Sequence, residues 1–291
     1  MNRRSQVGEV ARTAFCSSVA ELVKADAALR LQPDAQAVHH ARVAVRRLRS
    51  DVRTFRALLD AAWVDDLRER MRWLQDGFSA ARDADVLLER ARRDAGAILA
   101  PDERALDDGL APLREARAAA YQRLAANLRD DRYAALLCEL HAAADRLPFT
   151  ARAEEPAGAL AAQIIAGAWS TLRKRVRART RPPADHELHR IRIAAKRLRY
   201  ASEAFIPVVG RRARRLARSA GRLQATLGEQ HDAAGAVARM RALADDAQRA
   251  FLAGELAAVA AIAARAGRRA WRGAWRETRA RYRRLRRALR E

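Results

Sequence analysis

The sequence predicts an all-α protein made of two helical bundles, one in each half of the chain. Good helix formers dominate the 291 residues, of which 50% are hydrophobic and 32% are charged. Thirteen glycines, eight prolines and few β-branched residues leave little material for sheets. Apolar residues recur at helical spacing along almost the whole chain. One helical motif also occurs twice, which indicates two related halves.

Clusters of proline and glycine divide the helical pattern into its elements. In the first half, a long helix ends at the break Leu31–Asp34, a motif helix follows, and another break lies near Gly96–Pro101. The central break, Leu147–Gly158, separates the halves. The second half repeats this order, with breaks at Arg181–Asp185 and Pro207–Gly210. We therefore predict one bundle repeat over residues 1–150 and a second over 151–291.

The repeated motif is basic and contains histidine. Its first copy, HHARVAVRRLR, begins at His39, and its second, LHRIRIAAKRLRY, begins at Leu188. His189 follows His39 by 150 positions, and the later segments LQDGFSAARD and LQATLGEQHD are offset by 149. Asp34 and Asp185 follow prolines and are the expected N-caps. Both histidines would then lie in the first two turns of a helix, where the helix dipole favours anions.

Each motif helix has a cationic face and an apolar face. In the first copy, five cationic side chains share a stripe about 80° wide and roughly 21 Å long on an ideal helix. The apolar residues lie on the opposite side and predict a core contact. The first stripe contains His39, Arg42, Arg46, Arg49 and Arg53, opposite Val38, Ala41, Ala44, Val45, Leu48, Val52 and Phe55. The second contains His189, Arg192, Lys196 and Arg199, opposite Leu188, Ala195, Leu198 and Phe205.

The charge of the chain predicts a polyanionic partner. There are 58 Lys and Arg against 35 Asp and Glu, which gives a net charge of +23. Nucleic acid, anionic lipid and phosphate polymers all attract such a protein. A compositional bias toward arginine explains why arginine replaces lysine, but it does not explain the excess of positive charge. A solvated helix face usually mixes charges of both signs, and the first stripe does not.

At these motifs the sequence resembles the CHAD domain family, the conserved histidine α-helical domain. The resemblance rests on VHHARVAVRRLRSDVRTF and ELHRIRIAAKRLRYASEAF, followed by LQDGFSAARDADV and LQATLGEQHDAAGAV, and it covers nearly the whole chain. It implies two four-helix bundles related by a pseudo-two-fold axis, with a basic channel between them that binds inorganic polyphosphate. Some members carry a triphosphate-cleaving CYTH domain, which is acidic and rich in strands. We find no such segment, so we expect a stand-alone binding protein without a cofactor and not an enzyme.

The resemblance also implies the ligand residues. Arg53 extends the first stripe, whereas Glu203 occupies the matching position of the second stripe and weakens it. Four arginines lie at i,i+4 spacing on the following helices and either line the same channel or are solvated. The implied ligand residues are His39, Arg42, Arg46, Arg49, His189, Arg192, Lys196 and Arg199. The four further arginines are Arg68, Arg72, Arg218 and Arg222.

Other polar residues are expected to have lesser roles. Asp83 and Asp232 are interpreted as partners that orient arginines, because a carboxylate repels phosphate. We expect His40 and His186 to be peripheral, and His141 and His231 to be ordinary surface or core histidines. Arginines surround the motif histidines, so a metal site is not expected. There is no P-loop and no Ser/His/Asp signature.

Two further segments bear on location and on alternative functions. The C-terminal aromatics Trp271, Trp275 and Tyr282 recur at helical spacing and are expected to pack in the core. The longest apolar run, Leu256–Ala264, is too short to span a bilayer, and the N-terminus lacks a signal-peptide pattern. We therefore expect a cytoplasmic protein, located at polyphosphate granules with their protein partners. A nucleoid- or RNA-associated basic protein is the alternative, and a groove for an acidic protein is the third.

Overall fold

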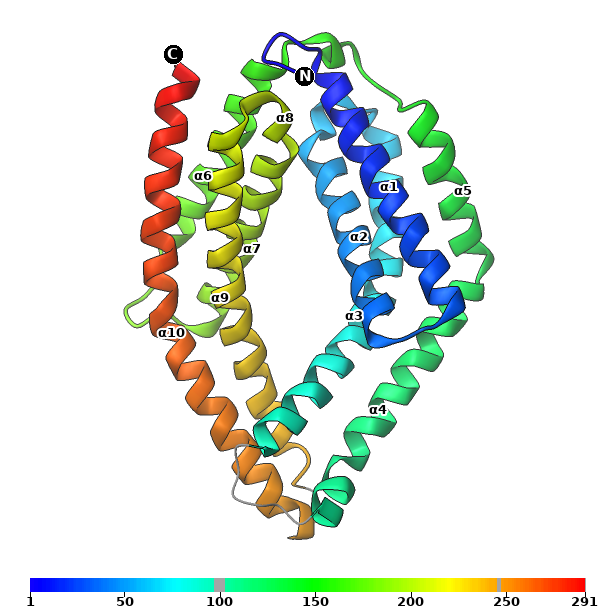
Figure 1. The fold of residues 1–291 in the computed structure, drawn as a ribbon, viewed down its shortest axis with the longest axis vertical. Helices are drawn as coiled ribbons and strands as arrows, with labels where there is room; N and C mark the ends of the chain where they lie inside the picture. Colours follow the sequence, from blue (N-terminus) through cyan, green and yellow to red (C-terminus); the bar gives the residue numbers. More distant parts are fainter. Residues whose placement is uncertain (97–102, 245–246, 291) are drawn as a thin grey trace.

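The computed structural model describes residues 1–96, 103–244 and 247–290, and these residues are almost entirely helical (Figure 1). The all-α prediction is therefore confirmed. The internal duplication and the boundary between residues 150 and 151 stay predictions.

The helices of the first half are α1 (Val7–Leu31), α2 (Ala35–Thr54), α3 (Ala61–Ala95), α4 (Glu103–Arg129) and α5 (Asp131–Asp145). Those of the second are α6 (Ala157–Arg177), α7 (Asp185–Ala204), α8 (Ile206–Val209), α9 (Arg211–Arg241) and α10 (Ala247–Arg290). Two short 3-10 helices, η1 (Arg56–Leu58) and η2 (Ala151–Glu154), lie in the loops.

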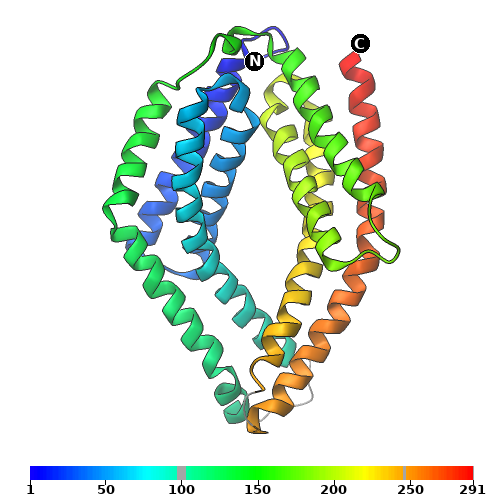
Figure 2. The same cartoon turned by 180° about the vertical axis from the view of Figure 1, so that it is seen from behind.

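The helices form two groups that lie side by side, with α1 to α5 in one and α6 to α10 in the other (Figures 1 and 2). In both views α2 and α7 are the helices that face each other across the middle of the molecule. Each group has its own apolar core, because each helix buries one face against its neighbours.

The two groups are joined at both ends. At the end that holds both termini, Phe55 packs edge-on against Phe205 at 5.5 Å, and the backbone N–H of Val7 donates to the carbonyl of Glu155 at 2.9 Å. We call these two contacts together the proximal joint. The distal joint is an apolar cluster from α3, α4, α9 and α10 and the turn after α9. Its buried members are Leu88, Ala91, Ala95, Leu110, Leu113, Met240, Leu243, Ala253, Leu256 and Ala257.

Helix α2 forms as its sequence predicts. The carboxylate of Asp34 accepts a hydrogen bond from the backbone N–H of Ala37 at 2.7 Å, which confirms the expected N-cap. The whole apolar face of the motif is buried, and Val38, Val45 and Leu48 have no exposed surface. Packing of that face turns the cationic stripe away from the core of the first half.

The expected N-cap of α7 is wrong. Ala184 is the N-cap, and Asp185 is already the first helical residue. The carboxylate of Glu187 accepts from the backbone N–H of Ala184 at 2.9 Å and from the Thr180 hydroxyl at 2.6 Å. Asp185 instead accepts hydrogen bonds from Gln230 and Arg268, which hold α7 against α9 and α10. The apolar face that the second motif predicts is buried.

The expected breaks fall at helix ends. Helix α3 ends at Ala95, and the rest of the break predicted near Gly96–Pro101 lies largely outside the described residues. Gly210 separates α8 from α9 with a φ of 72°, a conformation that glycine adopts without strain. Because α3 and α9 run beyond the ends of α2 and α7, they carry side chains down to the distal joint.

Helix α10 packs Trp271, Trp275 and Tyr282 inward, as the sequence predicts, whereas Phe251 near its start is exposed. Trp271 is fully buried, and Trp169 of α6 stacks on both Tyr282 at 4.3 Å and Trp275 at 5.1 Å. One segment of this helix, Arg249–Leu289, is long and apolar enough to cross a membrane by length and composition. Of the apolar stretch within it that meets this criterion, 28% is buried in the structure. The expectation that the chain has no membrane span was based on the shorter apolar run Leu256–Ala264, and it stays a prediction.

Candidate functional site

The two cationic stripes meet between the halves. The guanidinium of Arg46 on α2 donates to the hydroxyl of Tyr200 on α7 at 2.8 Å. Positive charges of Arg42, Arg46 and Arg53 on α2 act on Lys196 of α7. Helices that are about 150 residues apart in the sequence thus bring their cations into one cluster. We call the space between α2 and α7, together with the facing parts of α3 and α9, the central cleft.

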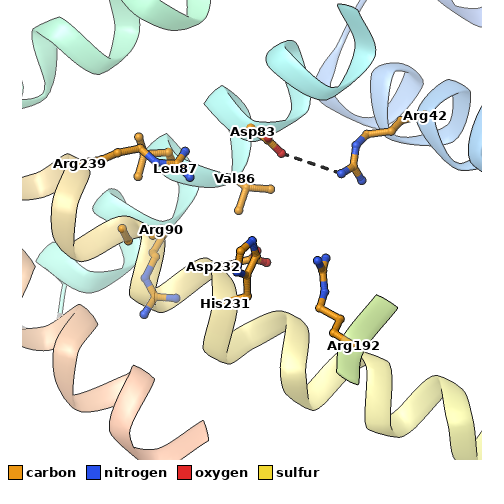
Figure 3. A pocket seen from close by; sticks show the side chains of 11 residues that line it. Arg42, Asp83, Val86, Leu87, Arg90, Arg192, His231, Asp232 and Arg239 are labelled. Carbon is orange, nitrogen blue, oxygen red and sulfur yellow. Dashed lines mark ion pairs between the residues drawn. The ribbon is translucent and has the colours of Figure 1, made fainter. Parts of the chain in front are cut away.

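The central cleft contains two cavities that follow one another along the motif helices. The first has a volume of about 180 Å³, and Arg42 and Arg192 point into it from opposite halves (Figure 3). The second has a volume of about 200 Å³ and takes up the next turns of the same helices, at Arg46 and Lys196. Arg49, Arg53, Arg68 and Gln75 complete its lining with Ile193. A chain of anions could follow the two cavities in turn.

Burial, and after it mutual repulsion, lowers the pKa values of the cations in the cleft. Burial, and after it the charges of Arg46, Arg192, Arg42 and Arg53, lowers the pKa of Lys196 to about 7. Partial burial and neighbouring arginines, first Arg197, lower the pKa of Arg53 to about 10. The pKa values of Arg42 and Arg49 are also lowered, first by burial. The cleft therefore holds more positive charge than its own residues compensate.

Few carboxylates balance this charge. In the first cavity Arg42 lies 4.0 Å from Asp83, as Figure 3 shows, and Arg90 pairs at 3.1 Å with Asp94, which is outside the lining. Within the described part of the chain, Arg53, Arg192 and Lys196 form no hydrogen bond or ion pair through their side chains. An anion with several oxygens would supply the missing partners, because arginine binds phosphate oxygens in pairs.

The two predicted ligand histidines, His39 and His189, lie near these cations but line neither cavity. Burial lowers the pKa of His39 and of His189, and nearby cationic groups lower both further. Their Nδ1 atoms are buried without a hydrogen-bond partner. The ring of His189 lies 4.5 Å from that of His231, whose pKa is also lowered, first by burial and then by Arg192. At neutral pH these histidines are poised to gain a proton when an anion binds.

The sequence did not predict every residue of the cleft. His231, which the sequence indicated to be an ordinary surface or core histidine, is exposed and lines the first cavity. The offset of 149 places His231 opposite Arg82, and Arg82 is the strongest charged influence on His39. The equivalence of His231 and Arg82 in the two halves was the sequence signal that could have placed His231 near the cleft. Arg90 and Arg239 also line the cavity; the same offset of 149 relates them, and they lie just beyond the repeated segments.

Several predicted residues lie apart from the cavities or have other partners. Arg199 pairs with Glu203 at 2.8 Å, and Arg47 reaches the same carboxylate at 3.5 Å, so the second stripe is neutralised at its end. Arg72 pairs with Glu69 at 2.7 Å. Arg222 pairs with Glu277 of α10, and Arg218 is exposed on α9 outside both cavities. Of the four arginines on the following helices, only Arg68 lines a cleft cavity, and it also lies 3.4 Å from Asp65.

The remaining polar residues have the following positions. Asp83 and Asp232 both line the first cavity, and Asp83 holds Arg42. His40 and His186 are exposed, as is His141 on α5. Among the described residues, no three His, Cys, Asp or Glu side chains gather closely enough to hold a metal ion. The cleft thus presents donors for an anion.

Comparison with known proteins identifies the family. The family model of the CHAD domain matches residues 13–241. A Mycobacterium tuberculosis protein described as uncharacterized, Rv2226, is 34% identical over 209 residues, which cover 66% of this chain and 38% of that protein. The chain therefore spans less than half of that relative's length.

Two solved structures share the fold. PptA from Streptomyces chartreusis has a TM-score of 0.73 and 22% identity, over 94% of this chain and 100% of the other. The CHAD domain from the plant Ricinus communis has a TM-score of 0.73 and 26% identity, over 93% of this chain and 94% of the other. On the match of the family model to most of its length, the chain belongs to the CHAD domain family.

Proposed function

We propose that this protein binds inorganic polyphosphate in the central cleft without reacting with it. The observation that carries the proposal is the meeting of the two motif stripes, which brings Arg42, Arg46, Arg192 and Lys196 into one cluster. Three groups of the cleft, those of Arg53, Arg192 and Lys196, have no partner within the described residues. Polyphosphate is the ligand that the resemblance to the family implies, and it has one negative charge for nearly every phosphate.

The shape of the cleft favours a thin chain. Cations line it from both halves, and each cavity has a volume of only about 180 or 200 Å³. A nucleic-acid duplex is far wider than such a cavity, so it would meet the outer rim of the cleft only. Polyphosphate has no side groups and can meet arginines from α2 and α7 at the same time.

The chemistry of the site favours binding over catalysis. Its histidines lie among arginines that repel a metal cation. Its carboxylates, Asp83 and Asp232, lie beside cations and compensate part of their charge. We extend the proposal to a cytoplasmic protein that is drawn to polyphosphate granules, where protein partners also gather.

Nucleic acid is the second candidate for the cleft, because a net charge of +23 attracts any polyanion. A competition titration separates the two. Labelled long-chain polyphosphate is displaced at fixed salt by duplex DNA, by single-stranded RNA and by short phosphates, all matched for charge. We expect polyphosphate to remain bound against a large excess of duplex DNA. If nucleic acid of equal total charge displaces polyphosphate equally well, nucleic acid becomes the favoured ligand of the cleft.

Two variants locate the site. In the cleft variant, Arg42, Arg46, Arg192 and Lys196 are replaced by alanine. In the control variant, four exposed arginines of α9 are replaced by alanine, which removes the same charge outside both cavities: Arg211, Arg212, Arg214 and Arg215. We expect the cleft variant to lose at least about tenfold in affinity for polyphosphate and the control variant to lose about twofold. Equal losses would contradict a dedicated cleft.

A further inference from the structure

A second basic hollow lies on the outer side of the second half, between α6, α10 and the loop that follows α6. Its volume is about 460 Å³, and seven arginines line it. We call these residues the outer cluster: Arg173, Arg177, Arg179, Arg181, Arg279, Arg283 and Arg286. Helices α6 and α10 lie on the side of α7 and α9 away from the first half (Figures 1 and 2). The outer cluster is therefore separate from the central cleft.

The outer cluster has no acidic counterpart. No carboxylate lines the hollow, and none of its seven arginines forms an ion pair within the part of the chain that the structure describes. Other surface arginines differ: Arg222 pairs with Glu277, whereas Arg218 is exposed on α9 without an ion pair within the described residues. The hollow continues across α6 into a shallower one of about 470 Å³, which Arg173, Lys174 and Arg177 line with Ser170. An elongated anion would meet cations along this whole surface.

Aromatic rings form the floor of the hollow. Trp169 stacks on both Trp275 and Tyr282, and all three line the cavity. Trp275 is the most accessible of them, because Trp169 and Tyr282 are largely buried. The guanidinium of Arg179 lies 5.3 Å from the centre of the ring of Trp271, a buried residue of α10 outside the lining, and this contact holds the loop against α10. Arginines around aromatic rings are the combination with which proteins bind unpaired bases and their phosphates.

We infer that the outer cluster is a second polyanion site that binds single-stranded nucleic acid. Polyphosphate has no apolar part and gains nothing from the rings. A duplex keeps its bases inside and presents only phosphates to a surface. A single strand offers both phosphates for the seven arginines and base faces for the exposed part of Trp275. The protein would then hold two different polyanions on separate faces.

The test measures the affinity of a labelled oligoadenylate of about 12 nucleotides at fixed salt by fluorescence anisotropy. In the outer variant, Arg173, Arg177, Arg279 and Arg283 are replaced by alanine. All four side chains are exposed, so the fold is expected to be retained, and circular dichroism checks this. We expect affinity for the oligoadenylate to fall at least about tenfold, while the cleft variant and the α9 control variant lose about twofold.

Polyphosphate of matched charge gives the opposite pattern if the two sites are distinct. The cleft variant should then lose polyphosphate binding and the outer variant should keep it. Equal loss of oligoadenylate binding in the outer and control variants would overturn the inference, because it would show a diffuse effect of charge. Loss of oligoadenylate binding in the cleft variant alone would place the nucleic acid in the central cleft and would overturn the inference as well. Competition by polyphosphate charge for charge at the outer cluster would show that bases play no part, and would overturn it too.

Discussion

Lys196 shows how a residue that we propose binds the ligand can destabilise the protein that carries it. Its pKa of about 7 in the fold lies below the ordinary value of 10.5, first because the side chain is buried and then because four arginines surround it. Between these two values the unfolded chain binds the proton and the folded protein does not. Stability therefore rises with pH in that window, and below about pH 7 the folded protein carries the full cost of the charged form.

Replacing Lys196 by methionine tests this cost. The variant keeps the length of the side chain and removes its charge, so we expect a higher Tm than the unsubstituted protein at pH 6 in the absence of ligand, by roughly 2–4 °C for each kcal/mol of repulsion removed. Polyphosphate binding should weaken at the same time. Thermal melts by circular dichroism at pH 6 and pH 9 check the prediction, and the gain should shrink at pH 9. A lower Tm at both pH values would show that Lys196 stabilises the fold.

Proton uptake should accompany polyphosphate binding. A bound phosphate favours the charged forms of Lys196, His39, His189 and His231, whose pKa values are all lowered in the ligand-free protein. We therefore expect affinity for polyphosphate to rise as the pH falls from about 8 to about 6. Isothermal titration in two buffers of different ionisation enthalpy measures the uptake directly. A pH-independent affinity would mean that these groups lie outside the contact.

At the scale of the element, periodicity predicted the faces of α2 and α7 but not all of their partners. The spacing placed Val45 and Leu48 in the core and Arg46 and Arg49 opposite them, and the structure agrees. The N-cap of α7 was wrong, because Glu187 reaches back to Ala184 and leaves Asp185 free to bind α9. The sequence around the start of α7 does not show which of these two acids caps the helix, because the partners of Asp185 lie on other helices.

Glu203 is the element-scale feature that limits the second stripe. It pairs with Arg199 and lies 3.5 Å from Arg47, so two cations at the end of the cleft are already compensated. We expect Glu203→Gln to raise affinity for polyphosphate by about twofold to tenfold and to increase the steepness of its salt dependence. Glu277→Gln is the matched control, because it frees Arg222 and Arg281 on the outer side. An equal gain in both variants would show that only net charge matters.

At the scale of the whole molecule, the two joints determine how closely the stripes approach. The distal joint combines residues such as Leu88 and Leu256, which lie in different halves of the chain. The sequence predicted that such residues would be buried but not that they would meet. Contacts between distant segments depend on how complete helices pack, and a helical pattern specifies a face without naming its partner.

Loosening the distal joint should weaken ligand binding without removing any cation. We expect Leu88→Ala combined with Leu256→Ala to lower both the free energy of unfolding and the affinity for polyphosphate, because each change leaves a cavity that costs about 2–5 kcal/mol. Leu136→Ala combined with Leu140→Ala lies in the core of the first half alone and is the control. Chemical denaturation and anisotropy measure the two effects. Equal losses of affinity would show that general instability is responsible.

The two joints have a topological consequence. Together with the two groups of helices they make a closed loop of protein around the central cleft (Figure 1). A long linear polymer that passed between the two groups from one face of the molecule to the other would be encircled by protein. It can leave only when one of its ends passes through or when a joint opens. Residence time should then keep growing with polymer length even after every cation in the cleft is occupied, and a large cyclic polymer would be refused entry unless a joint opens.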